Sequence, residues 1–293
     1  MKVEFECSTC VFHRGYEEIL EATNDPVIQF KAISGLLQLL AKEFKPTAVP
    51  AYLGTNRDRL IRKITGNADP YAEKKRMSNQ KALETLPFAE DIIAHESTLK
   101  ARFRKACLSS IVGNIMEFGI PTHRFRFEDI RRLIRQAEQE LAIDEIPKIF
   151  RIAKEANEVL YLTDNAGEIA FDRLLVQQLK DLDNHVVVAV KGGPVLNDAT
   201  MEDAKSVGLH EIADDVITTG TDAVGLVPEE SSNEFLNAYN SADFIIAKGM
   251  GHAETLSELR LKAPHALLLR TKCRPVANFL AVKKEKNVAK LMP

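Results

Sequence analysis

The stretch "VLYLTDNAGEIAFDRLL" (residues 159–175) joins an apolar run to a helical pattern through a polar turn. The run is apolar up to Leu162, as in a strand that is buried on both faces. Asp164 and Asn165 then stand side by side, and after Gly167 apolar residues recur at helical spacing. An Asp-Asn pair at such a turn has two interpretations: it caps the helix, or it binds a ligand.

Five short apolar runs of this kind occur after Ile146. They are EVLYLTD, HVVVAVKG, DDVITTG, DFIIAKG and HALLLRT, and helical or loop segments separate them. Near-continuous apolar strands that alternate with helices are typical of a parallel sheet covered on both faces. Residues 146–293 are therefore predicted to form a doubly wound α/β domain, with a mainly parallel sheet of five to six strands between two layers of helices.

The first half of the chain shows helical patterns only. The sequences NDP at residues 24–26 and DP at residues 69–70 combine a capping residue with a proline, as helix starts often do. A long helix is expected over residues 89–118, ended by a glycine and a proline shortly after it. Residues 1–145 are predicted to form an all-helical domain without strands. The join near residues 143–150 is short, so this domain is expected to pack over the sheet.

The composition limits the classes of function. A chain of 293 residues with 45% hydrophobic and 28% charged residues fits about two globular domains. A formal net charge of -3 argues against broad nucleic-acid binding, although it allows a local basic pocket for a small anion. The start MKVEFECSTC lacks the pattern of a signal peptide, and no apolar run approaches the roughly 20 residues that span a bilayer. We expect a cytoplasmic protein that binds neither nucleic acid nor membrane; no feature indicates its oligomeric state.

Polar residues follow each predicted strand. In open parallel sheets, ligands bind outside the carboxyl ends of the strands. The residues at these ends are Asp164-Asn165, Lys191-Gly192-Gly193 leading to Asn197-Asp198, Thr218-Thr219-Gly220, Lys248-Gly249-Met250-Gly251 and Thr271-Lys272-Cys273. Carboxylates, amides, lysines and glycines are thus expected to meet at one edge of the sheet.

This edge has the groups needed for phosphoryl chemistry. Asp164-Asn165 and Asp198 offer the oxygen ligands that hard divalent cations prefer. Lys248 and the glycines beside it offer a cation and accessible backbone amides for an anion. Each element alone has a simpler interpretation: Asn197-Asp198 also suits a helix cap, and KGMG matches neither the P-loop nor the dinucleotide spacing of glycines.

The cysteines and histidines allow several interpretations. Cys7 and Cys10 form a lone CxxC motif, which Cys107 and Cys273 would extend to a four-thiolate zinc site if the fold brought them together. A redox pair and a simple helix-packing role are the alternatives. His252, within KGMGH, is either a ligand or proton donor at the sheet edge or an ordinary residue of a helix start.

Three of these motifs resemble a known family. The stretches LTDNAGEIAFDRLL, VLNDAT and ADFIIAKGMGHAETL are similar to those of the metal-dependent damage-control phosphatases, which share their fold with a human protein described as an acidic-residue methyltransferase. TGNADPYAEKKRMSNQKAL (residues 65–83) resembles the family's Gly-Asn-x-Asp-Pro-Tyr segment, and VGNIMEFG (residues 112–119) its Gly-Asn-x-x-Asp helix. The start CSTC resembles the CxxC of the archaeal and microbial branch.

The resemblance implies roles for individual residues. Asp164 and Asn165 match the family's adjacent metal ligands, and Asp198 matches the third ligand. Lys248 and the backbone of Gly249 to Gly251 match the element that contacts phosphate. The implied catalytic residues are therefore Asp164, Asn165 and Lys248, and the implied cofactor is Mg²⁺, Mn²⁺, Co²⁺ or Ni²⁺.

Four further positions bear on the predicted site: two are expected to belong to it, and two differ from the residue that many relatives have. Asn114 matches an active-site amide that would bring the helical half over the sheet edge, and Glu168 lies one helical turn from the first ligand. Glu117 stands at a position of the substrate-binding region where relatives often have Asp. His252 stands where many relatives have Asn, which affects substrate choice more than chemistry.

The implied activity is metal-dependent hydrolysis of small phosphorylated metabolites, such as sugar phosphates or related damaged metabolites. The attacking group is either water or the carboxylate of Asp164. Two other functions remain open: a carboxyl methyltransferase that uses S-adenosylmethionine, and a non-catalytic protein that binds a phosphorylated ligand. The first βα turn, TDNAGE, lacks the several glycines usual where a backbone contacts a nucleoside, which argues against the methyltransferase.

Overall fold

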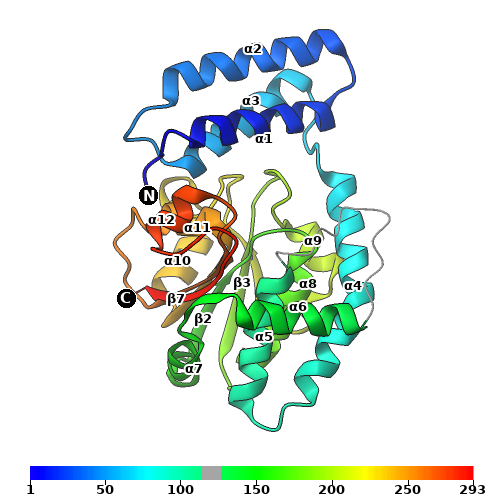
Figure 1. The fold of residues 1–293 in the computed structure, drawn as a ribbon, viewed down its shortest axis with the longest axis vertical. Coiled ribbons are helices and arrows are strands. Elements are labelled where there is room, and N and C mark those ends of the chain that lie inside the picture. Colours follow the sequence, from blue (N-terminus) through cyan, green and yellow to red (C-terminus); the bar gives the residue numbers. More distant parts are fainter. Residues whose placement is uncertain (114–126, 293) are drawn as a thin grey trace.

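A seven-stranded sheet forms the centre of the computed structural model, which describes residues 1–113 and 127–292 (Figure 1). The strands are β1 (Leu141–Asp144), β2 (Glu158–Leu162), β3 (His185–Val190), β4 (Asp215–Thr218), β5 (Phe244–Lys248), β6 (His265–Arg270) and β7 (Asn287–Met292). Their order across the sheet is β1-β7-β6-β5-β2-β3-β4. Neighbouring strands from β4 to β6 are parallel, whereas β7 is antiparallel to β6 and parallel to β1.

Helices precede the sheet and connect its strands. Those of the described residues are α1 (Cys7–Ala22), α2 (Pro26–Glu43), α3 (Pro50–Thr65), α4 (Ala72–Ala94), α5 (Leu99–Gly113), α6 (Phe127–Gln139), α7 (Ile146–Glu155), α8 (Glu168–Lys180), α9 (Met201–Ser206), α10 (Asn233–Ser241), α11 (Gly249–Leu256) and α12 (Arg274–Phe279), with short 3₁₀ turns at Leu209–Glu211 and Pro228–Glu230. The NDP pattern works as expected: Pro26 begins α2, and the side chain of Asp25 accepts hydrogen bonds from the amides of Val27 and Ile28.

The predicted fold class is confirmed. The five apolar runs are strands β2 to β6, and helices cover both faces of a mainly parallel sheet. The sheet is larger than the predicted five to six strands because β1 and β7 extend one edge. Both strands contain half-buried or exposed residues, so neither shows a continuous apolar run. The expectation of no strand before residue 146 is therefore wrong for β1.

The long helix expected over residues 89–118 is also wrong as a single element. Helix α4 ends at Ala94 and α5 begins at Leu99. Thr98 lies between them, and its hydroxyl oxygen accepts a hydrogen bond from the amide of Ala101, as a helix-capping residue does. The sequence pattern remained helical across the break because apolar residues on both sides enter the same core.

Alternate residues of β2 face two separate cores. Val159 and Tyr161 belong to a large core cluster with α4 to α9, whereas Leu160 and Leu162 belong to a second cluster with α10, α11 and α12. All four side chains are at most 1% exposed. Burial on both faces explains why this strand is apolar from Val159 to Leu162 and fixes the direction in which its last residues emerge from the sheet.

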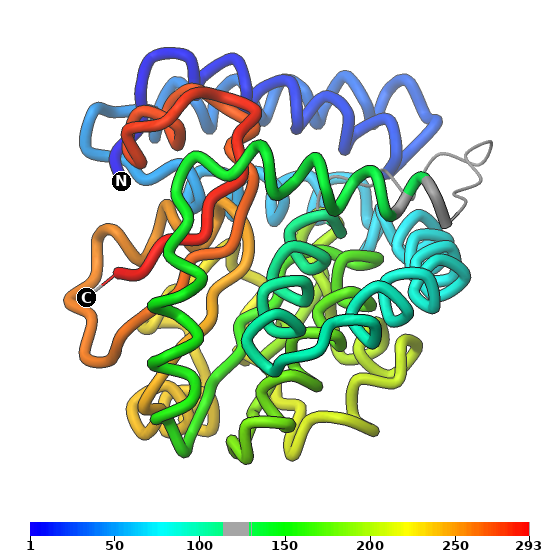
Figure 2. Tube along the Cα trace, turned by 60° about the horizontal axis from the view of Figure 1, so that its bottom comes forward, coloured from blue at the N-terminus to red at the C-terminus, as the bar shows by residue number. Residues whose placement is uncertain are grey.

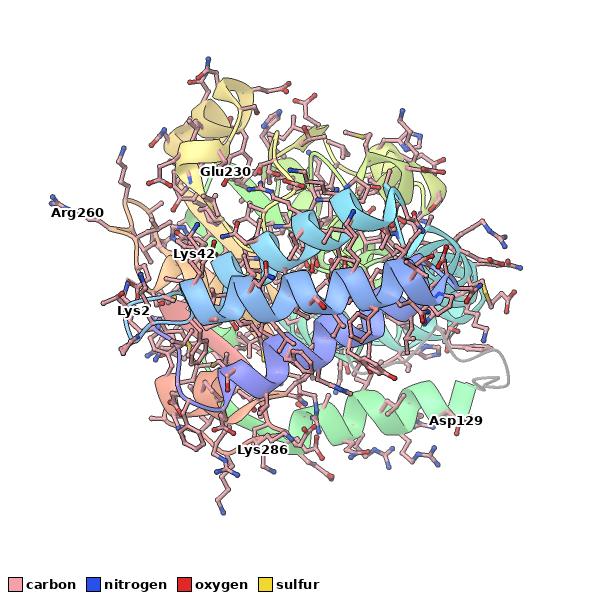
Figure 3. All side chains as sticks on the ribbon, turned by 90° about the horizontal axis from the view of Figure 1, so that it is seen from above. Lys2, Lys42, Asp129, Glu230, Arg260 and Lys286 are labelled. Atoms are coloured by element: carbon pink, nitrogen blue, oxygen red, sulfur yellow. The ribbon has the colours of Figure 1, made fainter. Side chains whose placement is uncertain are left out.

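Helices α1, α2 and α3 lie together across one end of the molecule (Figures 1 and 3). They share a small core of Ile19, Ala32 and Ile61. The amide of Val224, in the segment after β4, donates a 2.9 Å hydrogen bond to Thr55 Oγ1 of α3. In contrast, α4, α5 and α6 pack on the sheet domain, with α5 against α8. A domain division at residue 145 stays a prediction.

The N-terminal segment lies beside α11 and α12, whereas the C-terminus lies apart from it at the end of β7 (Figures 1 and 2). Lys2 forms an ion pair with Glu258 at 2.6 Å, and Asn278 of α12 donates a 3.1 Å hydrogen bond to Glu4. These contacts hold the start of α1 near the carboxyl ends of β5 and β6. Among the described residues, no helix is both long and apolar enough to cross a membrane.

Candidate active site

The turn after β2 pairs with the segment that carries Asp198. The backbones of Asn165 and Asp198 form an isolated antiparallel bridge. The amide of Ala199 donates a 2.8 Å hydrogen bond to the carbonyl of Asp164, and the amide of Ala166 donates a 2.9 Å hydrogen bond to the carbonyl of Asn197. The fold therefore brings together the three residues that the sequence predicted as metal ligands. Their position at the carboxyl ends of β2 and β3 is where ligands bind in such sheets.

The two carboxyl groups of this set repel each other. Burial raises the pKa of Asp164 well above its ordinary range, and the charges of Glu168 and Asp198 raise it further. Burial likewise raises the pKa of Asp198 to about 6, although the charge of Lys191 opposes this shift. Lys191 is buried, and its Nζ lies 3.7 Å from Asp198 Oδ2. The site thus concentrates negative charge that a bound cation would offset.

The side chain of Asn165 has a fixed orientation. Its Nδ2 donates hydrogen bonds of 2.8 Å to Asp164 Oδ2 and 3.0 Å to Glu168 Oε2. The amide oxygen, the atom that binds metals, therefore lies on the other side of the carboxamide group. Glu168 begins α8 and is buried, so it orients this amide from the protein interior.

Gly249 makes room for the carboxylate of Asp164. A β carbon at position 249 would lie 2.0 Å from Asp164 Oδ2, and the backbone φ of Gly249 is +79°. Both observations require glycine here, since L residues rarely adopt such a φ. The glycine at the end of β5 thus permits a close approach to the acid at the end of β2. Gly251, two residues later, lies within α11 and packs near Val224.

Lys248 is completely buried, and its ammonium group already has three partners. Nζ donates 2.6 Å hydrogen bonds to Glu168 Oε1 and Asp172 Oδ1, and a 3.2 Å bond to the carbonyl of Ser110. These acids raise the pKa of Lys248, so the side chain stays charged. Asp172 Oδ1 also accepts a hydrogen bond from Tyr161 Oη at 2.7 Å. Contact of Lys248 with phosphate, as predicted from the sequence, requires exchange of one of these partners.

His252 lies in α11 as a buried neutral side chain. Burial lowers its pKa to about 3, and its Nδ1 is 2.7 Å from the carbonyl of Lys248. A neutral imidazole is a poor proton donor at neutral pH. Lys272, which follows β6, contributes a positive charge that lowers the pKa of Asp164. The sequence placed Lys191 and Lys272 at the sheet edge without assigning a role to either.

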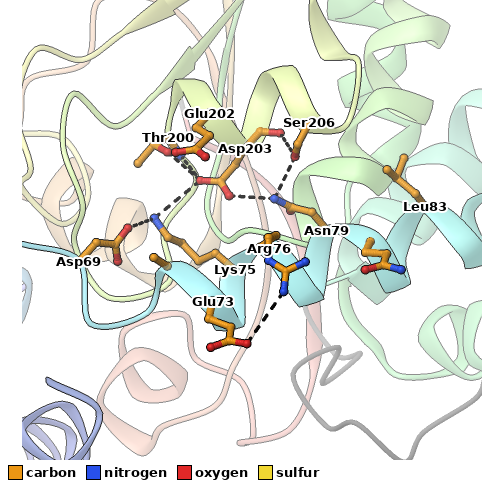
Figure 4. Close-up of a pocket in the computed structure, with 12 residues that line it drawn as sticks. Asp69, Glu73, Lys75, Arg76, Asn79, Leu83, Thr200, Glu202, Asp203 and Ser206 are labelled. Carbon is orange, nitrogen blue, oxygen red and sulfur yellow. Dashed lines mark hydrogen bonds and ion pairs between the residues drawn. The ribbon is translucent and has the colours of Figure 1, made fainter. Parts of the chain in front are cut away.

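Helix α4 reaches the site through Asn79, which the sequence did not indicate (Figure 4). Asn79 Oδ1 accepts a 2.7 Å hydrogen bond from the amide of Gly167, and its Nδ2 donates a 2.8 Å hydrogen bond to Asp203 Oδ1. The residue lies in the polar sequence RMSNQKAL, where no feature distinguishes it from an exposed helix residue. It lines a cavity of about 430 Å³ between α4 and α9.

Two predicted site residues, Asn114 and Glu117, lie outside the described residues. The four-thiolate zinc hypothesis is wrong. Cys107 is buried in the large core cluster, whereas Cys7, Cys10 and Cys273 line a separate cavity near the N-terminus. These three thiols are free.

The chemistry of the predicted ligand set fits a hard divalent cation. It offers two carboxylates and one amide oxygen. Burial, and after it the charge of neighbouring carboxylates, raises the pKa of both carboxyl groups, and a bound cation would offset both effects. Within residues 1–113 and 127–292, no group of three or more His, Cys, Asp and Glu side chains is arranged to hold a metal ion. The set Asp164, Asn165 and Asp198 is of a different kind, since one ligand is an amide.

Known proteins resemble this chain over nearly its whole length. The model of a family described as the damage-control phosphatase ARMT1-like domain matches residues 3–288. A damage-control phosphatase of Archaeoglobus fulgidus is 36% identical over 293 residues, covering 100% of both chains. One of Pyrococcus horikoshii is 38% identical over 286 residues, covering 97% of this chain and 96% of the relative.

The fold comparison gives the same result. The crystal structure of a DUF89 family protein from Pyrococcus horikoshii superposes with a TM-score of 0.87 at 37% sequence identity. The match covers 99% of this chain and 98% of the other. By its sequence and its fold, the chain belongs to the damage-control phosphatase ARMT1-like family.

Proposed function

We propose that this phosphatase-family protein hydrolyses phosphomonoesters of small metabolites, such as sugar phosphates, with a divalent metal held by Asp164, Asn165 and Asp198. The observation that carries the proposal is the backbone pairing of Asn165 with Asp198, which places two carboxylates and an amide at the carboxyl edge of the sheet. The bound metal, Mg²⁺, Mn²⁺, Co²⁺ or Ni²⁺, would supply a Lewis acid for a phosphoryl oxygen and a more acidic water.

The residues around this set have defined tasks in the proposal. Glu168 holds the amide of Asn165 in the orientation that turns its oxygen away from Glu168. Gly249 leaves space for the carboxylate of Asp164, and the backbone amides at the start of α11 offer donors for a phosphate group. Lys272 supplies positive charge near that carboxylate, which favours binding of a phosphate dianion, and Lys248 would contact the phosphate after it exchanges one of its present partners.

A screen of phosphorylated metabolites against a panel of divalent metals tests the proposal. We expect turnover that requires added metal and differs among small phosphate esters. Asp164→Ala, run beside the wild type, is expected to lose both metal uptake and turnover while it retains the native circular dichroism spectrum. Metal-independent turnover by the wild type, or wild-type turnover by Asp164→Ala, would contradict the ligand assignment.

The screen also separates a phosphatase from a protein that only binds phosphate esters. For a phosphatase, inorganic phosphate must accumulate in proportion to time and protein concentration. Ester binding seen by calorimetry, with no phosphate released under any metal, would identify a binding protein instead. A phosphoenzyme trapped on Asp164 after rapid acid quench would identify its carboxylate as the nucleophile, whereas its absence during turnover would favour water.

A further inference from the structure

One side chain of α4 contacts both segments that carry the candidate metal ligands. Asn79 is 3% exposed, and its Oδ1 accepts a 2.7 Å hydrogen bond from the amide of Gly167, in the turn after β2. Its Nδ2 donates hydrogen bonds of 2.8 Å to Asp203 Oδ1 and 3.1 Å to Ser206 Oγ, both in α9 (Figure 4). The turn after β2 carries two of the ligands, and α9 begins three residues after the third.

Asp203 extends this contact to the segment of the third ligand. Its Oδ2 accepts 2.8 Å hydrogen bonds from both the amide and the hydroxyl of Thr200, which lies two residues after Asp198. On α4, Lys75 lies one turn before Asn79 and forms an ion pair with Asp203 Oδ2 at 3.8 Å. The carboxylate of Asp203 is thus held between α4 and the start of α9, and its position sets that of the adjoining loop.

We propose that Asn79 is a positioning residue for the metal ligands, an inference that rests on the proposed function. Its single carboxamide holds the turn after β2 and the loop before α9 at one fixed separation. Without it, the buried amide of Gly167 and the carboxylate of Asp203 each lose a partner, and α4 no longer links the two ligand segments through this side chain. Residues that orient metal ligands commonly contribute ~10- to 100-fold to metal affinity.

Calorimetric titration of metal-free protein with Mn²⁺ tests this role without relying on turnover. We expect Asn79→Ala to bind Mn²⁺ ~10- to 100-fold more weakly than the wild type. In hydrogen-exchange experiments on the metal-free proteins, the amide of Gly167 is expected to exchange faster in this variant. Asn184→Ala is the matched control, because Asn184 is also buried and its Nδ2 donates hydrogen bonds of 2.9 and 2.6 Å to the carbonyls of Ala153 and Ala156.

Asn184 precedes β3 and therefore lies at the amino-terminal ends of the strands, whereas the ligands lie at the carboxyl ends. We expect Asn184→Ala to lose stability, as Asn79→Ala does, but to bind Mn²⁺ with the affinity of the wild type. This comparison separates positioning of the metal site from a general loss of stability. Equal weakening in both variants would show that any buried amide has this effect, and the inference would be wrong.

An exchange of side chains provides a second test. Asn79→Asp alone places a second carboxylate beside Asp203 and removes the donor, so we expect weak Mn²⁺ binding. Combined with Asp203→Asn, it restores the hydrogen bond between the two side chains with donor and acceptor reversed. The carboxylate at position 79 can still accept a hydrogen bond from the amide of Gly167. The amide oxygen at position 203 can still accept the hydrogen bonds from Thr200. We expect the double variant to recover at least tenfold of the lost affinity, and no recovery would contradict the inference.

The outcomes separate this inference from the proposed function. If the wild type takes up Mn²⁺ and Asp164→Ala does not, the ligand assignment holds; unchanged affinity in Asn79→Ala would then refute the positioning role alone. If the wild type takes up no Mn²⁺, Mg²⁺, Co²⁺ or Ni²⁺, both the ligand assignment and the positioning role are wrong.

Discussion

The carboxylate of Asp164 lies directly against the α carbon of Gly249, so that a β carbon at position 249 would be 2.0 Å from Asp164 Oδ2. The end of β2 and the start of α11 can meet in this way only while residue 249 has no side chain. This contact links the acid proposed to hold the metal to the segment proposed to receive the phosphate.

Gly249→Ala is therefore expected to damage activity more than stability. The added methyl group must displace the Asp164 carboxylate, and a φ of +79° costs an L residue roughly 1–2 kcal/mol. We expect turnover to fall ~100-fold, a loss like that caused by misplacing a catalytic group by about 1 Å. Steady-state kinetics and thermal unfolding measure the two effects. Gly208→Ala is the control, since Gly208 has a φ of +69° but the three atoms nearest to a β carbon there all belong to the side chain of Glu211. Equal losses of activity in both variants would show that the contact with Asp164 is not the cause.

Lys248→Ala is expected to destabilise the fold as well as the active site. It leaves the buried carboxylates of Glu168 and Asp172 without their cation, and breaking a buried pair in this way costs about 3–5 kcal/mol. Denaturant unfolding measures this loss. Lys148→Ala is the control, because it removes a surface ion pair with Glu145 in which the lysine side chain is 56% exposed. Its loss should lower the free energy of unfolding by at most ~1 kcal/mol.

A companion variant tests the cause of that loss. Lys248→Met combined with Asp172→Asn removes one of the two buried carboxylates that lose their cation, so the double variant should be more stable than Lys248→Met alone. If both are equally stable, charge burial is not what makes Lys248 necessary.

The buried acid Glu18 gives the fold a measurable pH dependence. Burial raises its pKa from an ordinary 4.5 to about 9, and the neighbouring carboxylate of Asp58 adds to the shift. The folded protein holds this proton more tightly than the unfolded chain does. Its contribution to stability is therefore complete below pH 4.5, declines as the pH rises, and is lost above about pH 9.

Glu18→Gln should remove this dependence, because an amide has no proton to lose. Relative to the wild type, the variant should gain stability between pH 5 and pH 9, by more than the ~1.4 kcal/mol that one pKa unit represents. Denaturant unfolding at several pH values measures this difference. Glu90→Gln, at an exposed position of α4, should show no such trend. A constant difference between Glu18→Gln and the wild type across this range would mean that Glu18 is ionised in the fold.

The sequence predicted the parts of the fold that depend on continuous burial. Strands such as β2 and β5 are covered on both faces, so residues 159–162 and 244–247 are apolar without a break and indicate a strand directly. The edge strand β1 alternates between half-buried and exposed residues over four positions, too short for its period to be read. The break between α4 and α5 was missed because Thr98 caps a helix in the middle of a continuous helical pattern.

The same reasoning explains which parts of the site could be predicted. Asp164, Asn165 and Asp198 follow recognisable strands, and the rule for parallel sheets places such residues at one edge. The partners of Lys248 could not be predicted, since Asp172 and Ser110 come from two helices whose packing is decided by tertiary structure. Neither could the role of Asn79, whose contacts depend on how α4 crosses the sheet edge.

Hydrolysis of p-nitrophenyl phosphate by metal-free protein, titrated with Mn²⁺, shows whether Asp164 and Asp198 hold a catalytic metal. We expect turnover by the wild type to rise from background to saturation as Mn²⁺ is added. We expect Asp164→Ala and Asp198→Ala to stay at background at every concentration while they remain folded. Turnover by either variant at the rate of the wild type, under the same Mn²⁺, would contradict the claim that these two acids form the metal site of the enzyme.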